Sequence, residues 1–476
     1  MQEYRTLWKK RWDAPWMRVI LYTTAMLILP EYFAPALAPL ALGAAVKDAR
    51  RRESGLCGGS FTVPLALYIV YSLLGLIYSV VRLSTLASVL MWAVSAFYYI
   101  ALVTVITDRR RLSTALAYLI SGVGVNGLMA TVQYVCKGVF RLNVDMQAFK
   151  WLDRLLNNAF GYPLYADFGS RASASFTNPN ILGEFFVLFL PFVFYYLSRQ
   201  TNLKRTSAVR LSALLIAFGL LFTFCRGAYL ALLLIAALHF AINIKKAPFL
   251  LVITMAILLL IPQSVYARIF SLSGAGGYIG GVMDNVKGDK EHGGDGDLLD
   301  SILDNADKAP DSTGEKPPKA FSERVQVWSA SLDAILKRPL FGYGAGELTI
   351  CRLLKSYKVA PPHAHNLALQ LLLEGGILSL GIWFSMAFSV LRKGYRLLVR
   401  STDNQSGMAA VSFICGVCVV GLTDYPFLTP KLVSGVLIAL ALIDVMYQQN
   451  TADKKIRLLS EFTPGRRKAV NTADGR

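Results

Sequence analysis

Long apolar runs recur along the whole sequence and constrain the fold more than any other feature. A helix needs about 20 mainly apolar residues to cross the hydrocarbon core of a bilayer. We predict twelve such segments, of which the first two are short and contain prolines. They lie near residues 17–30, 33–46, 61–81, 86–106, 112–135, 180–198, 208–225, 227–244, 247–262, 366–391, 408–423 and 431–447. The pattern predicts an all-α polytopic membrane protein with about twelve transmembrane helices.

The composition supports a membrane location. Of 476 residues, 54% are hydrophobic and only 17% are charged, which is more apolar surface than a soluble protein of this size normally buries. A water-soluble multidomain enzyme is therefore excluded. The net charge of +19 is typical of membrane topology and of contact with anionic lipid headgroups. We expect membrane lipids as partners and no nucleic acid.

The distribution of basic residues predicts the topology. Basic clusters alternate with nearly neutral turns along the chain, as the positive-inside rule requires when the N-terminus is cytoplasmic. The clusters are KDARRRE, DRRR, SRQTNLKRTSAVR, IKK and LRKGYRLLVR, whereas the short outer turns carry one basic residue each: Arg82, Arg226 and Lys431. The first apolar run has no cleavage site of the kind that follows a signal peptide. We therefore expect a multi-pass protein of the cytoplasmic membrane with both termini in the cytoplasm.

This topology divides the chain into four parts. Residues 1–262 hold nine spans and an outer loop at 136–179, and residues 263–365 form a large extracytoplasmic loop before the tenth span. Residues 366–447 hold the last three spans, and 448–476 form a basic cytoplasmic tail.

The large loop itself has two compositions. Residues 274–320 are rich in Gly, Asp, Lys and Pro, which predicts disorder. Residues 321–338 predict an amphipathic helix, because Val325, Trp328, Leu332 and Ile335 recur at helical spacing. We expect a second, interfacial helix at 144–160 in the other outer loop.

Several common site types are absent from the sequence. There is no Walker A loop and no dinucleotide fingerprint, so we expect no cofactor and no direct use of ATP. The six cysteines do not suggest a disulfide framework, since five lie in or beside apolar runs. Cys415 and Cys418 form a C-x-x-C inside such a run, without the βαβ context of a redox motif.

Arginines on the outer side are the first candidates for chemistry. Arg226 interrupts two apolar runs on the side where a basic residue is least expected, and intramembrane charges are functional by default. The alternative is that Arg226 extends to lipid phosphates. Arg324 opens the loop helix and Arg171 precedes ASASFTNPN. Guanidinium groups bind phosphate in a bidentate manner, so these three side chains suggest a phosphate site.

Two of the four histidines occur together in PPHAHNLALQLLLEGGI, at the start of a predicted span. A neutral imidazole near pH 7 can take a proton from an acceptor hydroxyl, with Asn366 or a loop carbonyl fixing its tautomer. We expect no metal, because His363 and His365 would point in different directions on a helix. The alternative is that these residues only cap the helix. Asp424, in the outer turn LTDYP, is placed to orient a histidine or an arginine.

Four stretches, in this order, carry a resemblance to a known family. They are RASASFTNPNILGEFFVLFLP, CRGAYLALLL, SERVQVWSASLDAILKRPLFGYGAGEL, and HAHNLALQLLLEGGI with a later GLTDYP. Over roughly residues 60–445 the chain resembles the O-antigen ligase and polymerase-like membrane proteins. The Gly- and Asp-rich insertion at 274–320 departs from the family pattern.

The resemblance implies an all-helical membrane glycosyltransferase fold of the GT-C type. It implies transfer of a glycan from a polyprenyl (undecaprenyl) pyrophosphate carrier to a lipid or glycan acceptor on the outer face, in surface polysaccharide biosynthesis. By this resemblance Arg226 and Arg324 hold the pyrophosphate and His365 assists the acceptor hydroxyl, with no metal. The candidate substrate-binding residues are Arg171, Asn180, His363, Asn366 and Asp424.

Three other functions remain open at this point. The motifs do not separate a ligase from a polymerase of the same family. A solute transporter also has many spans and few buried charges, although its site is expected near the membrane midplane rather than at one face. A non-catalytic scaffold of an envelope assembly complex is the third.

Overall fold

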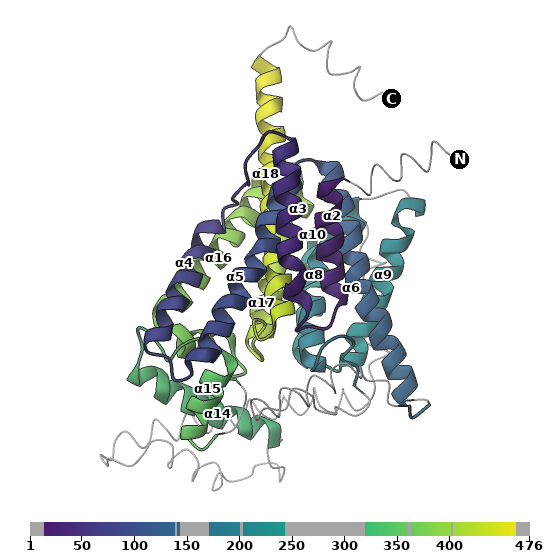
Figure 1. Cartoon of the computed structure of the whole chain (residues 1–476). Helices are drawn as coiled ribbons and strands as arrows, with labels where there is room; N and C mark the ends of the chain where they lie inside the picture. The colour runs from purple at the N-terminus through teal and green to yellow at the C-terminus, as the bar shows by residue number, and fades with distance from the viewer. Residues whose placement is uncertain are drawn as a thin grey trace.

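The computed structural model describes residues 14–138, 140–142, 171–199, 203–242, 319–359, 363–400 and 403–462. These residues form thirteen α-helices and two short 3-10 turns, with no strand among them. Most helices run alongside one another as a bundle, and two lie beyond one end of it (Figure 1). The bundle helices are α2 (Pro15–Ile28), α3 (Ala38–Arg51), α4 (Thr62–Leu74), α5 (Arg82–Val105), α6 (Arg109–Gly138), α8 (Pro179–Arg199), α9 (Leu203–Thr223), α10 (Arg226–Ile242), α16 (Leu367–Arg400), α17 (Asn404–Gly421) and α18 (Pro430–Phe462).

The protein is a polytopic membrane protein, as predicted. Seven described helices are long and apolar enough to cross a membrane: α5, α6, α8, α9, α16, α17 and α18. Two apolar helices, 62–77 and 226–241, are shorter.

The predicted number of twelve spans is not confirmed. The two proline-containing segments form α2 and α3, which have 14 residues each and are not among the candidate spans. The predicted span at 247–262 and the predicted interfacial helix at 144–160 lie outside the described residues. The same holds for residues 274–318, which include nearly all of the segment for which we predict disorder.

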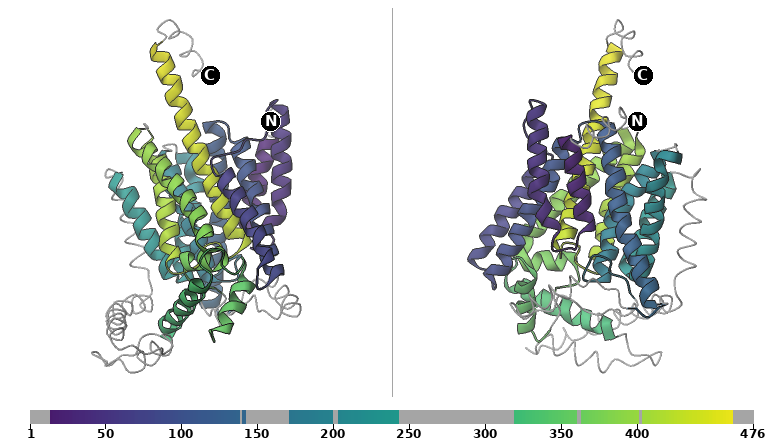
Figure 2. Two further views of the ribbon diagram at one scale, coloured as in Figure 1. Left: turned by 90° about the vertical axis from the view of Figure 1, so that its left-hand side faces the viewer. Right: turned by 45° about the vertical axis from the view of Figure 1, so that its right-hand side comes forward.

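Arginines from separate loops meet at one end of the bundle. Arg52 and Arg111 both contact Asp48, at 2.9 and 3.1 Å, and the Arg111 guanidinium lies 5.1 Å from the ring of Trp16 at the start of α2. α18 extends from this same end (Figures 1 and 2). Arg52 of KDARRRE and Arg111 of DRRR therefore lie at the same end of the described bundle.

Two helices lie at the opposite end of the bundle, α14 (Lys319–Lys337) and α15 (Glu347–Ser356) (Figure 2). Helix α14 covers most of the segment 321–338 for which we predict an amphipathic helix, but the expected buried positions are partly wrong. Val327, Ala330 and Ala334 are buried, whereas Leu332 is 51% exposed. The helix packs through Val327, Ala330, Ala334 and Ile335 into an apolar cluster that includes Ile350 and Leu354 of α15 and Leu373 of α16.

The turn after α14 is hydrogen-bonded to α16 at a break in that helix. Gly375 and Gly376 have non-helical backbone angles and interrupt this helix, which is longer than the predicted 366–391. The Tyr343 amide donates to the Leu373 carbonyl at 2.8 Å, and the Ile377 amide donates to the Pro339 carbonyl at 2.9 Å. The break exposes backbone groups that the turn then satisfies, so the loop carrying α14 is anchored to the bundle.

Candidate functional site

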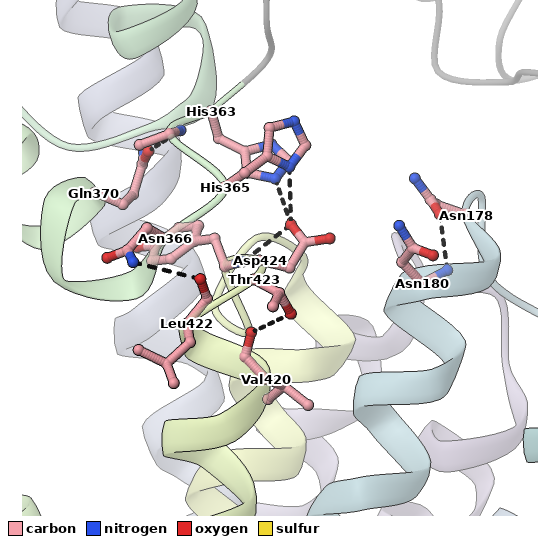
Figure 3. A network of polar contacts seen from close by, with 12 residues as sticks. Asn178, Asn180, His363, His365, Asn366, Gln370, Val420, Leu422, Thr423 and Asp424 are labelled. Atoms are coloured by element: carbon pink, nitrogen blue, oxygen red, sulfur yellow. Dashed lines mark hydrogen bonds and ion pairs between the residues drawn. The ribbon is translucent and has the colours of Figure 1, made fainter. Parts of the chain in front are cut away.

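The two histidines and the aspartate singled out in the sequence meet directly. His363 Nε2 lies 2.6 Å from Asp424 Oδ1, and His365 Nδ1 lies 3.3 Å from the same oxygen. The two imidazole rings are 4.1 Å apart between their centroids. The histidines lie in the loop before α16 and Asp424 lies in the loop after α17 (Figure 3). They come together because the chain at 363–366 is not helical, so the expectation of diverging side chains does not apply.

His365 adopts a strained backbone conformation. Its φ is +49°, a left-handed angle that non-glycine residues rarely adopt. Such strain costs about 1–3 kcal/mol and persists where the surrounding structure enforces it, often at functional sites. Phe224, two residues before Arg226, has a φ of +52°. Strained residues thus accompany two of the predicted catalytic positions.

Asn366 does not fix a histidine tautomer, which corrects the sequence interpretation. Its Oδ1 accepts from the amides of Ala368 and Leu369 at 3.0 and 3.1 Å. Asn366 is therefore the N-cap of α16. Its Nδ2 donates to the Leu422 carbonyl at 3.5 Å, which joins the start of α16 to the Asp424 loop (Figure 3). Asp424 takes the orienting position instead.

Burial and hydrogen bonding set the charge of this group. Burial on its own disfavours the Asp424 carboxylate, but the hydrogen bonds with His363 and His365 outweigh it and hold the pKa of Asp424 below its ordinary value. Burial lowers the pKa of His363, against the opposing effect of Asp424. We infer an ionised Asp424 that accepts from a neutral His363.

Among the described residues, these three side chains are also the group that could hold a metal ion. One ligand atom from each of His363, His365 and Asp424 lies within 4.8 Å of the others, and these are suitable ligands for zinc. Neighbouring ligands of a tetrahedral zinc are about 3.3 Å apart, given Zn–N and Zn–O bonds near 2.0 Å. The 2.6 Å contact of His363 with Asp424 is shorter and fits a hydrogen bond. The geometry therefore favours a hydrogen-bonded group.

Helix α14 brings Arg324 to the histidine loop. The indole Nε1 of Trp328 donates to the Ala364 carbonyl at 3.0 Å, between the two histidines. Arg324 lies four residues earlier, on the same side of the helix, and interacts electrostatically with His363 and with Glu184 of α8.

Arg226 is the first residue of α10 and lies close to the Asp424 loop. A Cβ added to Gly227 would be 2.5 Å from Thr423 Oγ1, so a larger residue here would displace the Thr423 hydroxyl. Thr423 is next to Asp424, and its hydroxyl donates to the Val420 carbonyl at 3.2 Å. The start of α10 therefore abuts the loop that orients the histidines.

Arg171 and Asn180 form a pair beside α9. Arg171 donates through Nε to the Thr223 carbonyl at 2.8 Å and through Nη2 to Asn180 Oδ1. Asn178 caps α8 by accepting from the Asn180 amide at 2.8 Å, with proline at the first helical position. Figure 3 shows both asparagines at this helix start. Arg171 is thus bound to the carbonyl of Thr223 at the end of α9 and to the side chain of Asn180 at the start of α8. Thr223 lies three residues before Arg226.

Sequence reasoning missed several residues that line or support this region. Glu184 is buried, and its Oε2 has no hydrogen-bond partner among the described residues. Gln370 and Glu374 are polar and four residues apart within an apolar run, a spacing that places them on one helix face. This spacing was the sequence signal by which Gln370 and Glu374 could have been recognised as a polar pair. No sequence pattern indicates that Tyr425 contacts Glu374, because the two are 51 residues apart.

A comparison with family models finds that residues 211–384 match the O-antigen ligase family. This is a membrane protein with an O-antigen ligase domain. The O-antigen ligase domain includes Arg226, Arg324 and His365, whereas Arg171, Asn180 and Asp424 lie outside the matched range. The family implies glycosyltransferase activity of the ligase or polymerase type, with lipid-linked glycans as substrates. A search of curated proteins found no match to the chain.

Proposed function

We propose that this protein transfers a glycan from a polyprenyl pyrophosphate carrier to an acceptor hydroxyl on the outer face of the cytoplasmic membrane. The observation that carries the proposal is the contact of His365 with Asp424 inside a chain with an O-antigen ligase domain. When His365 Nδ1 donates to Asp424, the lone pair of Nε2 is available as a base. Nε2 makes no hydrogen bond within the part of the chain that the structure describes.

The reaction is a single displacement with inversion. The acceptor oxygen attacks the anomeric carbon of the donor glycan, and the bond from that carbon to the pyrophosphate oxygen breaks. The polyprenyl pyrophosphate leaves with the electron pair, while His365 Nε2 takes the proton of the acceptor hydroxyl. Asp424 stabilises the imidazolium that forms.

Arg226 and Arg324 supply the positive charge for the leaving pyrophosphate. Guanidinium groups keep their charge at any working pH and stabilise phosphate oxygens without a metal. Arg171 contributes to the electrostatic field, since its own hydrogen bonds are to Thr223 and Asn180. We place Asn180, His363 and Asn366 at the border of the substrate site, where they shape it.

The location of these residues argues against a transporter. They lie at the bundle end with α14 and α15, rather than between helices halfway along the bundle, where transporters bind their substrates. With the arginine-rich end in the cytoplasm, this site faces outward and both termini are cytoplasmic.

The test uses purified protein in liposomes with a labelled polyprenyl-pyrophosphate oligosaccharide and candidate acceptors. We expect His365→Ala to lower the rate of transfer by about 10²–10⁴-fold, the usual range for a general base, with donor binding largely retained. Arg226→Ala and Arg324→Ala should weaken donor use. Arg82→Ala, which removes an exposed arginine at the first position of α5, is the control.

The product analysis separates the remaining functions. One transferred glycan on a terminal acceptor indicates a ligase, and lengthening carrier-linked chains indicate a polymerase. A chelator should leave the rate unchanged, because the site works through hydrogen bonds and arginines. Normal turnover by all three variants would refute the assignment, and solute uptake without transfer would favour the transporter.

A further inference from the structure

Glu374 lies at the break of α16 and is almost fully buried. It is 4% exposed and directly precedes the two non-helical glycines. A cavity of about 10 Å³ beside it has room for roughly one water molecule. A glycan or a lipid therefore cannot reach this side chain, and its role must be exerted through its neighbours.

One carboxylate oxygen of Glu374 connects to the histidine loop. Oε1 accepts from Gln370 Nε2 at 2.9 Å. The other end of the same amide, Gln370 Oε1, accepts from the backbone N–H of Ala364 at 2.9 Å. Ala364 lies between His363 and His365, so this chain of two hydrogen bonds fixes the backbone that presents both imidazoles.

The other oxygen connects to the aspartate loop. Tyr425 donates through its hydroxyl to Glu374 Oε2 at 3.1 Å. The backbone N–H of Tyr425 donates to Asp424 Oδ1 at 3.0 Å, which is the oxygen that both histidines contact. Tyr425 and Gln370 are 4% and 0% exposed, and buried hydrogen bonds of this kind hold their groups firmly.

The loop after α14 reaches the same residue. The Gly344 amide donates to the main-chain carbonyl of Glu374 at 2.9 Å, and the Gly346 amide stabilises the carboxylate electrostatically. Three segments that are distant in the sequence are thus joined at one buried residue: the histidine loop, the aspartate loop and the turn that follows the Arg324 helix.

We propose that Glu374 is a positioning residue that sets the distance between His365 and Asp424 by holding both of their loops. This inference rests on the proposed function, in which His365 is the base that Asp424 orients. A displacement of about 1 Å in such a contact can lower a rate by up to roughly 100-fold, so the effect belongs to the chemical step and not to donor binding.

The test compares Glu374→Ala and Glu374→Gln in the liposome assay. Glu374→Ala should lower kcat by about 10- to 100-fold with little change in the KM for the donor. The pH profile of kcat should also differ from that of the wild type, because the contact of His365 with Asp424 is altered. Glu374→Gln should recover most of kcat, since its amide accepts from Gln370 and donates to the Tyr425 oxygen.

Asp444→Asn is the matched control for loss of a buried carboxylate. Asp444 is 1% exposed, accepts from Ser60 and Tyr99 and pairs with Lys393, and none of these partners lies in the histidine loop or the aspartate loop. This variant should lower the melting temperature without moving the pH profile. Tyr425→Phe removes the hydroxyl alone and should show part of the Glu374→Ala effect, which keeps the test available if Glu374→Ala does not fold.

The outcomes separate this inference from the proposed function. If His365→Ala is inactive while Glu374→Ala and Tyr425→Phe keep the wild-type kcat and pH profile, the positioning role is refuted and the base remains. If Glu374→Ala is unstable, the other two variants decide. The positioning role is then refuted if both Glu374→Gln and Tyr425→Phe keep the wild-type kcat and pH profile. Full activity of His365→Ala refutes the proposed function itself.

Discussion

Asp424 is the residue on which the site depends, because one of its oxygens contacts both histidines. The histidines have different environments, although only Ala364 separates them. His363 is 4% exposed and its Nδ1 has no hydrogen-bond partner among the described residues, whereas the side chain of His365 is 24% exposed. The exposed imidazole can meet a substrate, and the buried one supports Asp424.

The buried state of His363 predicts a pH dependence of stability. Burial lowers its pKa in the folded protein, so below about pH 6.5 the unfolded chain binds a proton on this side chain that the folded protein does not. The free energy of unfolding should therefore fall as the pH decreases below about 6.5. We expect His363→Gln to reduce this fall, as measured by melting temperatures in detergent at pH 7.5 and 5.5. Equal falls in both proteins would contradict the assignment.

At the scale of elements, the break in α16 organises this end of the molecule. Gly376 has a φ of +62° and a ψ of −160°, a combination that is essentially restricted to glycine. A Cβ at this position would lie 2.3 Å from the carbonyl carbon and oxygen of Leu340. The turn after α14 can contact α16 only because this side chain is absent.

Gly376→Ala should therefore destabilise the protein by at least about 1–3 kcal/mol, the cost of such backbone strain, and should lower transfer because the loop carrying Arg324 loses its anchor. Melting temperature and transfer rate check both expectations. Gly381→Ala is a matched control on the same helix, because a Cβ there meets nothing within 4 Å. Alanine is the better helix former, so Gly381→Ala should be neutral or slightly stabilising. Similar melting temperatures for both variants would contradict the role of the break.

At the scale of the whole molecule, buried polar groups connect helices that are far apart in the sequence. Lys431 was expected in an outer turn, but it is fully buried at the start of α18. Its ammonium donates to the Leu29 carbonyl at 2.8 Å, to Asn126 and to Ser175. Glu31 is also buried, accepts from Thr177 and interacts electrostatically with Lys431. The network joins α2, α6, α18 and the segment before α8.

Lys431→Met removes the donor that the Leu29 carbonyl, Asn126 and Ser175 share, and leaves buried acceptors unsatisfied. We expect this variant to destabilise the protein by about 1–3 kcal/mol. The double variant Glu31→Gln with Lys431→Met should regain part of this loss, with a coupling free energy of about 0.5–3 kcal/mol. Denaturation in detergent, read as a double-mutant cycle, measures the coupling. Strictly additive effects would show that the two charges are independent.

The apolar runs predicted a polytopic helical membrane protein, because the cost of burying a charge in hydrocarbon acts on each segment separately. The candidate residues His363, His365 and Asp424 were likewise visible as polar residues beside apolar runs. Such local signals depend only on neighbouring residues in the chain.

Only the tertiary structure decided which of these groups touch. The contacts of Asp424 with His363 and of Tyr425 with Glu374 join residues 61 and 51 positions apart. The correct role of Asn366, the buried face of α14 and the burial of Lys431 depend on how loops and helices pack. Periodicity does not encode these relations, because hydrogen bonds and close packing are satisfied between segments whose separation along the chain is arbitrary.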